Sequence, residues 1–341
     1  MSTANEPKPM KNKPPSRQKI TFSFIKILTG SDLSRRRLPV MKAVSRRRGP
    51  VVWLTGCIHG DEVGGLVVIQ EIFKRLRRHP LKKGRLFTFP MMNPFGFELS
   101  SRNISIGDED LNRSFPGNKN GSLAKRIAHT IFTGITRSNP SLVLDLHNDW
   151  RNSIPYALID PDPGPAYKDA YGKAAEAMQL SGLLLIKEAT GGEDAAVSHK
   201  TLPGSMLRTG IPALTLELGE AFVVNEENVK HGIDAVWRVL AGMEMVEPGF
   251  DSEPFSLPEE VKGRFLEYSH SPLSTSSGII RFLVRPGDLV KEKQPVARIY
   301  NAFGKLMETV LAKSPGIVLG LSDSSVAFPG VPILAFGILK D

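Results

Sequence analysis

Residues 51–76 read VVWLTGCIHGDEVGGLVVIQEIFKRL and combine three patterns that indicate the fold. The apolar run at residues 51–54 ends at Gly56, which is typical of a short buried strand. Beyond Gly64 the apolar residues recur with helical spacing, at Leu66, Ile69, Ile72, Phe73 and Leu76. The stretch therefore predicts a strand, a polar loop and a helix in succession, a unit from which α/β folds are built.

The same alternation continues along the chain. Strand patterns occupy residues 20–28, 40–44, 85–91, 142–146, 183–186 and 213–218, and helix patterns occupy residues 122–136, 165–179 and 225–243. Strands that alternate with helices predict an α/β domain with a largely parallel central sheet.

A change of pattern near residues 247–258, which are rich in Pro, Glu and Ser, indicates a domain boundary. Beyond it, short apolar pieces are punctuated by Gly or Pro about every ten residues, which is typical of all-β structure. The sequence therefore predicts a disordered basic tail at residues 1–19, an α/β domain at 20–247 and a β domain at 259–341.

Composition narrows the class of protein. Hydrophobic residues make up 41% and charged residues 23% of 341 residues, which is ordinary for a globular chain of two domains. No apolar run is long enough to cross a membrane, and residues 1–19 lack the apolar stretch of a secretory signal. We expect a cytoplasmic protein without a membrane partner, and the sequence is compatible with a homo-oligomer.

The formal net charge of +9 comes largely from basic clusters at residues 35–37, 46–48, 75–78 and 82–83. Basic patches can bind nucleic acid, but these clusters lack interleaved aromatic residues and no nucleic-acid-binding motif accompanies them. We interpret them as solvated surface and expect no nucleic-acid partner.

The loop at residues 56–62, Gly-Cys-Ile-His-Gly-Asp-Glu, carries the first candidate site. His59 and Glu62 are close enough in sequence to reach one ion across a tight turn, although such a pair is also common in surface turns. His147 ends another apolar strand, and Cys57 is the only cysteine, so any metal must be held by His and carboxylate groups. Two histidines and one glutamate form a ligand set of known zinc hydrolases.

Alternatives remain for several of these residues. His147 could be a histidine of the core, and Asp145 could either orient a ligand or cap a loop. A metal-activated water needs a general base, and Glu217 is the candidate because it ends an apolar strand, where a carboxylate is costly to bury. Glu220 is the competing candidate, with a loop position as its simpler interpretation.

Arginines follow in the loops after residue 93. Arg102, Asn112 and Arg113 place two guanidinium groups and one amide near the expected site. Guanidinium groups bind carboxylates in a bidentate manner, so these residues are candidates for substrate binding. Taken alone, they could equally be surface residues.

Taken together, the motifs at residues 56–62, 93–94, 110–117, 145–148 and 215–219 resemble the succinylglutamate desuccinylase/aspartoacylase family, a branch of the zinc carboxypeptidase superfamily. The resemblance implies an α/β fold with a mixed central sheet flanked by helices and a smaller C-terminal β domain of barrel-sandwich type. It also implies one zinc ion held by His59, Glu62 and His147, with Glu217 activating the water. Arg102, Asn112 and Arg113 would bind the substrate carboxylate and polarise the scissile carbonyl.

The C-terminal segment resembles a lipoyl or biotinyl sandwich, although Lys305 lacks the flanking residues of a modified lysine. We expect this domain to shape the entrance of the site rather than to carry a prosthetic group.

The function that the resemblance implies is hydrolysis of the amide bond of a small N-acylated amino acid. Two alternatives stay open, namely a zinc carboxypeptidase that acts on short peptides and a binding protein of the same fold without catalysis. A third, with Cys57 as nucleophile, lacks a base, and a small core residue is the simpler interpretation of Cys57.

Overall fold

The computed structural model describes residues 18–29, 35–189, 197–249 and 255–339. Its main feature is a mixed sheet of thirteen strands. The path runs through β1 (Lys19–Thr29), β2 (Arg35–Val44), β4 (Arg85–Phe89), β3 (Val51–Gly56), β5 (Leu142–Asp149), β9 (Ala213–Glu220), β7 (Pro155–Ile159), β8 (Leu184–Lys187), β10 (Phe265–Ser269), β17 (Leu334–Ile338), β15 (Gly316–Leu321) and β12 (Leu289–Val290), with β6 (Asn152–Ser153) paired to β15.

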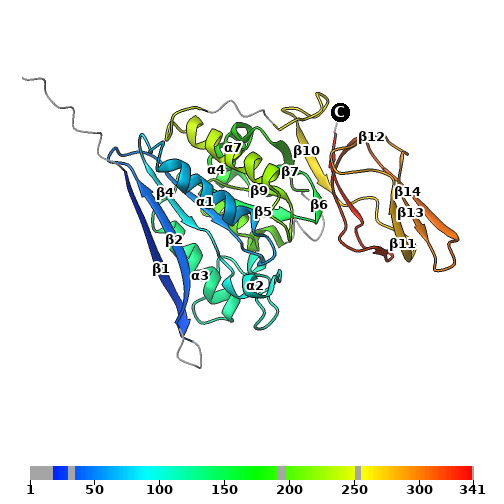
Figure 1. The fold of residues 1–341 in the computed structure, drawn as a ribbon, viewed down its shortest axis with the longest axis horizontal. Coiled ribbons are helices and arrows are strands. Elements are labelled where there is room, and N and C mark those ends of the chain that lie inside the picture. Colours follow the sequence, from blue (N-terminus) through cyan, green and yellow to red (C-terminus); the bar gives the residue numbers. More distant parts are fainter. Residues whose placement is uncertain (1–17, 30–34, 190–196, 250–254, 340–341) are drawn as a thin grey trace, which may run out of the picture.

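Helices cover both faces of this sheet (Figure 1). On one face α1 (Gly64–Leu76), α4 (Lys168–Ser181) and α7 (Glu226–Gly242) pack over a hydrophobic cluster that includes Leu54, Leu144 and Leu214. On the other face α3 (Leu123–Thr136) and α6 (Leu202–Leu207) cover a second cluster with Trp53 and Val143. Neighbouring residues of one strand enter opposite clusters because side chains alternate across a sheet. The predicted α/β architecture is confirmed.

The mixed central sheet that the resemblance implies is confirmed, but the expectation of a largely parallel sheet is wrong, because antiparallel pairs occur at both ends of the sheet as well as in its middle. The pairs β4–β3, β3–β5, β5–β9, β7–β8 and β8–β10 are parallel, whereas β7 runs antiparallel to β9 in the middle of the sheet. Strand β7 follows β5 after only a short turn around residues 150–154. A parallel arrangement would need a longer crossover connection, so the short turn makes β7 run opposite to β5 and to its parallel neighbour β9. The predicted helix at residues 165–179 is also divided, because a 3-10 turn at Pro165–Tyr167 precedes α4.

The C-terminal segment continues the main sheet. β10 pairs with β8 in parallel, with Phe265 opposite Leu185, and β15 pairs with β6. Leu266 and Ile317 share a buried cluster with Tyr156 of β7. Residues after the predicted boundary are thus joined to the preceding ones by backbone hydrogen bonds and by a common core.

A second sheet completes this segment. It contains β14 (Leu306–Leu311), β13 (Pro295–Tyr300), β11 (Gly278–Phe282) and β16 (Val326–Ala327), all antiparallel. A third hydrophobic cluster lies between this sheet and the end of the main one, with Val296, Val318 and Phe336 as members. The prediction of all-β structure in this segment is confirmed.

The predicted tail, residues 1–19, lies outside the described residues except for its last two. Lys19 is the first residue of β1. Gln18 is fixed by two hydrogen bonds, one donated to Leu76 O at 2.6 Å and one accepted from Leu81 N at 2.8 Å. Among the helices that the structure describes, none is long and apolar enough to cross a membrane.

Candidate active site

The candidate site lies where β3, β5 and β9 end at the same edge of the sheet. Strand β3 ends at Gly56, and the loop that follows leads into α1. This loop packs closely on α2 (Pro94–Leu99), because Gly60 N donates to Ser101 O at 2.9 Å. A Cβ atom on Gly60 would lie 1.9 Å from the carbonyl carbon of Gly96, so only glycine fits there. The close packing fixes the loop that carries His59 and Glu62.

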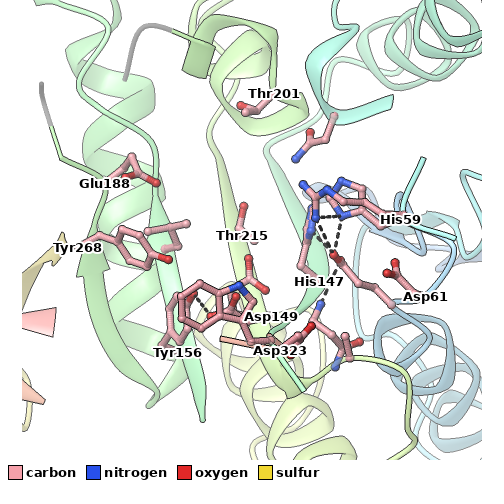
Figure 2. A pocket seen from close by; sticks show the side chains of 18 of the residues that line it. His59, Asp61, His147, Asp149, Tyr156, Glu188, Thr201, Thr215, Tyr268 and Asp323 are labelled. Atoms are coloured by element: carbon pink, nitrogen blue, oxygen red, sulfur yellow. Dashed lines mark hydrogen bonds and ion pairs between the residues drawn. The ribbon is translucent and has the colours of Figure 1, made fainter. Parts of the chain in front are cut away.

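The structure brings His59, Glu62 and His147 together (Figure 2). All three side chains are buried, and one possible ligand atom from each lies within 4.8 Å of the others. His59 Nδ1 is 2.5 Å from Glu62 Oε1, and His147 Nδ1 is 2.9 Å from Glu62 Oε2. Both imidazoles therefore turn the same ring nitrogen toward one carboxylate, an arrangement suited to sharing a cation.

The second nitrogen of each imidazole contacts an aspartate. His147 Nε2 is 3.0 Å from Asp145 Oδ2, and Asp145 Oδ1 accepts a hydrogen bond of 2.7 Å from Thr55. His59 Nε2 is 3.2 Å from Asp110 Oδ1. Carboxylates in these positions fix the orientation of histidine ligands. Asp145 had two possible roles, and the structure shows its contact with His147. The contact of Asp110 with His59 was not predicted, although Asp110 begins the motif at residues 110–117.

Arg102 lies at the rim of this cluster with its side chain 49% exposed. Its Nη2 is 3.2 Å from Asp110 Oδ2, and its Nη1 is 3.3 Å from His59 Nδ1. Although burial raises the pKa of Asp110, His59 and Arg102 together hold it well below its usual range. Burial also raises the pKa of Glu62, but His59 and His147 outweigh it and hold this pKa low. Both carboxylates are therefore kept in the ionised form.

Glu217 occupies the centre of the sheet edge. In the pairing of the strands it lies opposite His147 of β5 on one side and Tyr156 of β7 on the other. Burial raises the pKa of Glu217 well above its usual range, and its Oε2 atom is buried without a hydrogen-bond partner among the described residues. Burial thus favours the protonated form of this carboxyl group, so the carboxylate has an increased tendency to accept a proton from a bound molecule.

Glu220 is engaged elsewhere. Its Oε2 accepts hydrogen bonds of 2.7 Å from Asn225 and 2.9 Å from Asn228, at the beginning of α7. It does not belong to the residues that line the pocket around Glu217. The geometry thus favours Glu217 over Glu220 as a proton acceptor.

Asn112 and Arg113 lie in a 3-10 turn at Leu111–Arg113, whose start is capped by Asp110. Asn112 Oδ1 accepts a hydrogen bond of 2.9 Å from Leu202 N and so ties this turn to α6. Arg113 Nη1 donates to Asn112 O at 3.1 Å, and both side chains line the pocket. Arg113 can thus contact a molecule bound in the pocket, whereas Asn112 Oδ1 is already engaged in the hydrogen bond from Leu202 N.

The pocket has a volume of about 510 Å³ and includes residues that the sequence interpretation missed. These lie at the end of β5, directly after β7 and β8, and in the C-terminal segment, and are Asp149, Asp160, Glu188, Tyr268, His270 and Asp323. The Trp150 ring stacks on His270 with 5.8 Å between centroids, and Arg151 N donates to Asp323 Oδ1 at 2.7 Å. The C-terminal segment thus forms one wall of the pocket.

Cys57 is poorly suited to act as a nucleophile. The side chain is buried, and burial raises the pKa of its thiol to about 12, with Glu62 and Asp61 adding to the effect. At neutral pH the sulfur therefore stays protonated, whereas nucleophilic cysteines react as thiolates.

The chain is similar to known proteins in sequence and in fold. The chain is 28% identical over 295 residues, 83% of its length and 80% of the relative's, to N-alpha-acetyl-L-2,4-diaminobutyric acid deacetylase of Halomonas elongata. Its fold matches the product-bound ectoine utilization protein EutE (DoeB) from Ruegeria pomeroyi, with a TM-score of 0.78, 20% identity, and 96% and 98% of the two chains covered.

More distant folds include a metallo-carboxypeptidase from Burkholderia cenocepacia, with a TM-score of 0.51, 14% identity, and 67% and 65% of the two chains covered. The model of the succinylglutamate desuccinylase/aspartoacylase catalytic domain matches residues 48–243, more than half of the chain and the part that contains the histidine cluster and Glu217. The chain therefore belongs to the succinylglutamate desuccinylase/aspartoacylase family of deacylases.

Proposed function

We propose that this protein is a zinc-dependent amidohydrolase that removes the acyl group from a small N-acylated amino acid. The observation that carries the proposal is the presence, in one pocket, of the His59, Glu62 and His147 cluster together with the carboxyl group of Glu217, which has a buried oxygen without a hydrogen-bond partner among the described residues. The first can hold a metal ion, and the second can accept a proton.

The donor set fits zinc. Two imidazole nitrogens and one carboxylate are usual ligands of catalytic zinc, and Asp145 and Asp110 support the two imidazoles from behind. A bound zinc ion would supply a Lewis acid that lowers the pKa of water and polarises the scissile carbonyl.

In this proposal Glu217 is the general base. It takes a proton from the attacking water and returns it to the nitrogen of the leaving amine, so that no net proton is consumed at this residue. The raised pKa favours uptake of the proton from the water, and the carboxylic acid that forms is the donor to the amine.

Arg102 and Arg113 are the proposed contacts for negative charge. They are the two arginines that line the pocket, which otherwise contains many carboxylates. Arg113 lies on the rigid turn tied to α6 and can bind the substrate carboxylate or the oxyanion that forms during attack. Asn112 would contribute mainly by holding this turn in place.

Two features support a small substrate. The described relative is, by its name, a deacetylase of an acetylated amino acid, and the C-terminal segment closes one wall of the pocket. We propose that residues 20–247 supply the chemistry and residues 259–341 limit access.

A short peptide is the second candidate substrate, because part of the fold is shared with a metallo-carboxypeptidase. A cytoplasmic location and a homo-oligomeric state stay predictions.

Metal analysis and a substrate panel test this proposal together. We expect about one zinc ion per purified chain, and hydrolysis of N-acetyl amino acids that stops on removal of the metal and returns with zinc. Faster cleavage of short peptides with a free carboxyl end would favour a carboxypeptidase. Tight binding of acetylated amino acids without turnover, in zinc-loaded protein, would support the non-catalytic alternative.

A further inference from the structure

The pocket wall across from the histidines is formed by the ends of β7 and β8. Tyr156, Leu158 and Asp160 line the pocket at alternate positions, so β7 turns one face toward it. Beyond the last paired residues of the two strands, Glu188 N donates to Ile159 O at 2.9 Å. Asp160 and Glu188 therefore leave the two parallel strands side by side, and Figure 2 shows Glu188 on the side of the pocket away from His59 and His147.

Asp160 is buried with few partners. It is 8% exposed, and its Oδ1 accepts one hydrogen bond of 3.1 Å from the hydroxyl group of Thr201. Within the described ranges of the chain, no lysine, arginine or histidine forms an ion pair with it. Burial raises the pKa of Asp160 to about 6, and Thr201 and the more distant Arg208 and Arg113 offset this only in part. A buried carboxylate in this state is stabilised by a cation from a bound molecule.

The charge of the whole pocket points the same way. Apart from Glu62, the pocket is lined by six carboxylates and two arginines. The carboxylates are Asp61, Asp149, Asp160, Glu188, Glu217 and Asp323, and the arginines are Arg102 and Arg113. Arg102 contacts His59, whereas the charge of Arg113 acts on both Asp110 and Asp160. Since the carboxylates still outnumber the two arginines, the pocket favours a ligand that carries a positive group.

We infer that Asp160 and Glu188 form a subsite for an ammonium group on the side chain of the substrate. This inference rests on the proposed function and narrows it to N-acylated diamino acids. The acylated nitrogen lies near the histidines, the carboxylate meets an arginine, and the free ammonium group at the other end pairs with the two carboxylates. The acetylated amino acid in the name of the Halomonas relative carries such a second amine.

Three substrates of nearly equal size and different charge test the inference. N-α-acetyl-2,4-diaminobutyrate, N-acetylnorvaline and N-acetylglutamate present an ammonium, a methyl and a carboxylate group at similar positions. We expect the wild-type kcat/KM to fall in that order. Asp160→Asn should lower the value for the cationic substrate about tenfold to a hundredfold, the usual weight of a hydrogen bond to a charged group, and change the value for N-acetylnorvaline less than threefold or so.

Glu188→Gln should also lower kcat/KM for the cationic substrate. It provides a second test if Asp160→Asn does not fold. Asp169→Asn removes the same charge from an exposed ion pair with Lys173 and should leave the substrate preference unchanged. Equal losses for all three substrates in the Asp160 and Glu188 variants would show a structural role and overturn the inference. So would a wild-type enzyme that prefers the uncharged substrate.

A failure of the proposed function would look different. In that case zinc-loaded wild-type protein hydrolyses none of the three substrates. Calorimetric binding of free 2,4-diaminobutyrate and norvaline then decides the subsite. Preference for the diamine that is lost in Asp160→Asn supports the subsite, and equal affinity for the two refutes it.

Discussion

On one side of the pocket, which we term the histidine side (His59, Glu62, His147, Asp110 and Asp145), each carboxylate lies within hydrogen-bond distance of an imidazole. On the carboxylate side (Glu217, Asp160 and Glu188), Glu217 has a buried oxygen without a hydrogen-bond partner in the part of the chain that the structure describes, and Asp160 accepts a hydrogen bond from the hydroxyl group of Thr201. The pKa values of Glu62 and Asp110 are lowered, whereas burial raises those of Glu217 and Asp160. The same sheet edge thus carries carboxylates that stay ionised, which suit a metal ion, and carboxyl groups that can gain or lose a proton, which suit a substrate.

The largest effect is expected on the histidine side. His147→Ala removes one of three proposed ligands and should reduce zinc from about one ion per chain to a trace, with loss of activity. Elemental analysis measures the metal, and circular dichroism checks the fold. His79→Ala, at an exposed position after α1, is the control that should keep its zinc. Full zinc occupancy in His147→Ala would remove His147 from the metal site.

Glu217→Gln tests the carboxylate side. Because glutamine cannot accept the proton, kcat should fall by about two to four orders of magnitude while zinc content stays unchanged. Glu220→Gln is the matched control and should keep most activity, since Glu220 binds Asn225 and Asn228 instead. An active Glu217→Gln enzyme beside an inactive Glu220→Gln enzyme would reverse the assignment.

Arg113→Ala should have a smaller effect on activity than His147→Ala or Glu217→Gln. Loss of a donor to the developing oxyanion should lower kcat about a hundredfold to a thousandfold, with zinc retained. Steady-state kinetics separate kcat from KM. Arg126→Ala, on the exposed surface of α3, serves as control. A rise in KM at constant kcat would instead assign Arg113 to binding of the ground-state carboxylate.

Asp145→Asn should weaken the histidine side without removing a ligand. The neutral amide no longer stabilises the orientation and basicity of His147, so zinc affinity should fall about tenfold to a hundredfold. Competition with a chelator measures the affinity. Thr55→Val deletes only the hydroxyl donor to Asp145 and should have a smaller effect. Equal affinities in wild-type and Asp145→Asn protein would contradict an orienting role.

The smallest effect concerns stability. The pKa of Asp160 is about 6 in the folded protein and 3.8 in its reference state, so the folded form binds the proton more tightly. The contribution of protonated Asp160 to the free energy of unfolding is therefore fully present below pH 4 and is lost as the pH rises through 6. Asp160→Asn should therefore melt a few degrees above wild type at pH 8, and the gap should shrink toward pH 4. Melting curves with a gap that does not change with pH would refute this origin of the effect.

Much of the histidine side, and Glu217 of the carboxylate side, could be predicted because these residues lie at or just after recognisable strand ends. The apolar runs before Gly56, at residues 142–146 and at residues 213–216 place His59, His147 and Glu217 at one edge of a sheet. The alternation of strands and helices likewise predicted the architecture. Here local pattern and tertiary structure agree, so the sequence is informative.

The other two residues of the carboxylate side, Asp160 and Glu188, could not be predicted in the same way. Strand β7 follows β5 without a clear turn signal, and its antiparallel place beside β9 depends on long-range pairing. Asp160 and Glu188 become neighbours only through the register of β7 with β8. Tyr268, His270 and Asp323 reach the pocket because β10 extends the sheet from a segment far along the chain. No local periodicity encodes such contacts.

The stacking of Trp150 on His270 provides an intrinsic optical reporter. The protein has three tryptophans, and Trp53 and Trp237 are buried in the two hydrophobic clusters that flank the main sheet. Trp150 alone lines the pocket, with its ring against a histidine of the C-terminal segment. Its indole emission is sensitive to the adjacent imidazole, so the steady-state fluorescence of a Trp53→Phe, Trp237→Phe variant follows the seating of that segment against the pocket without an attached dye.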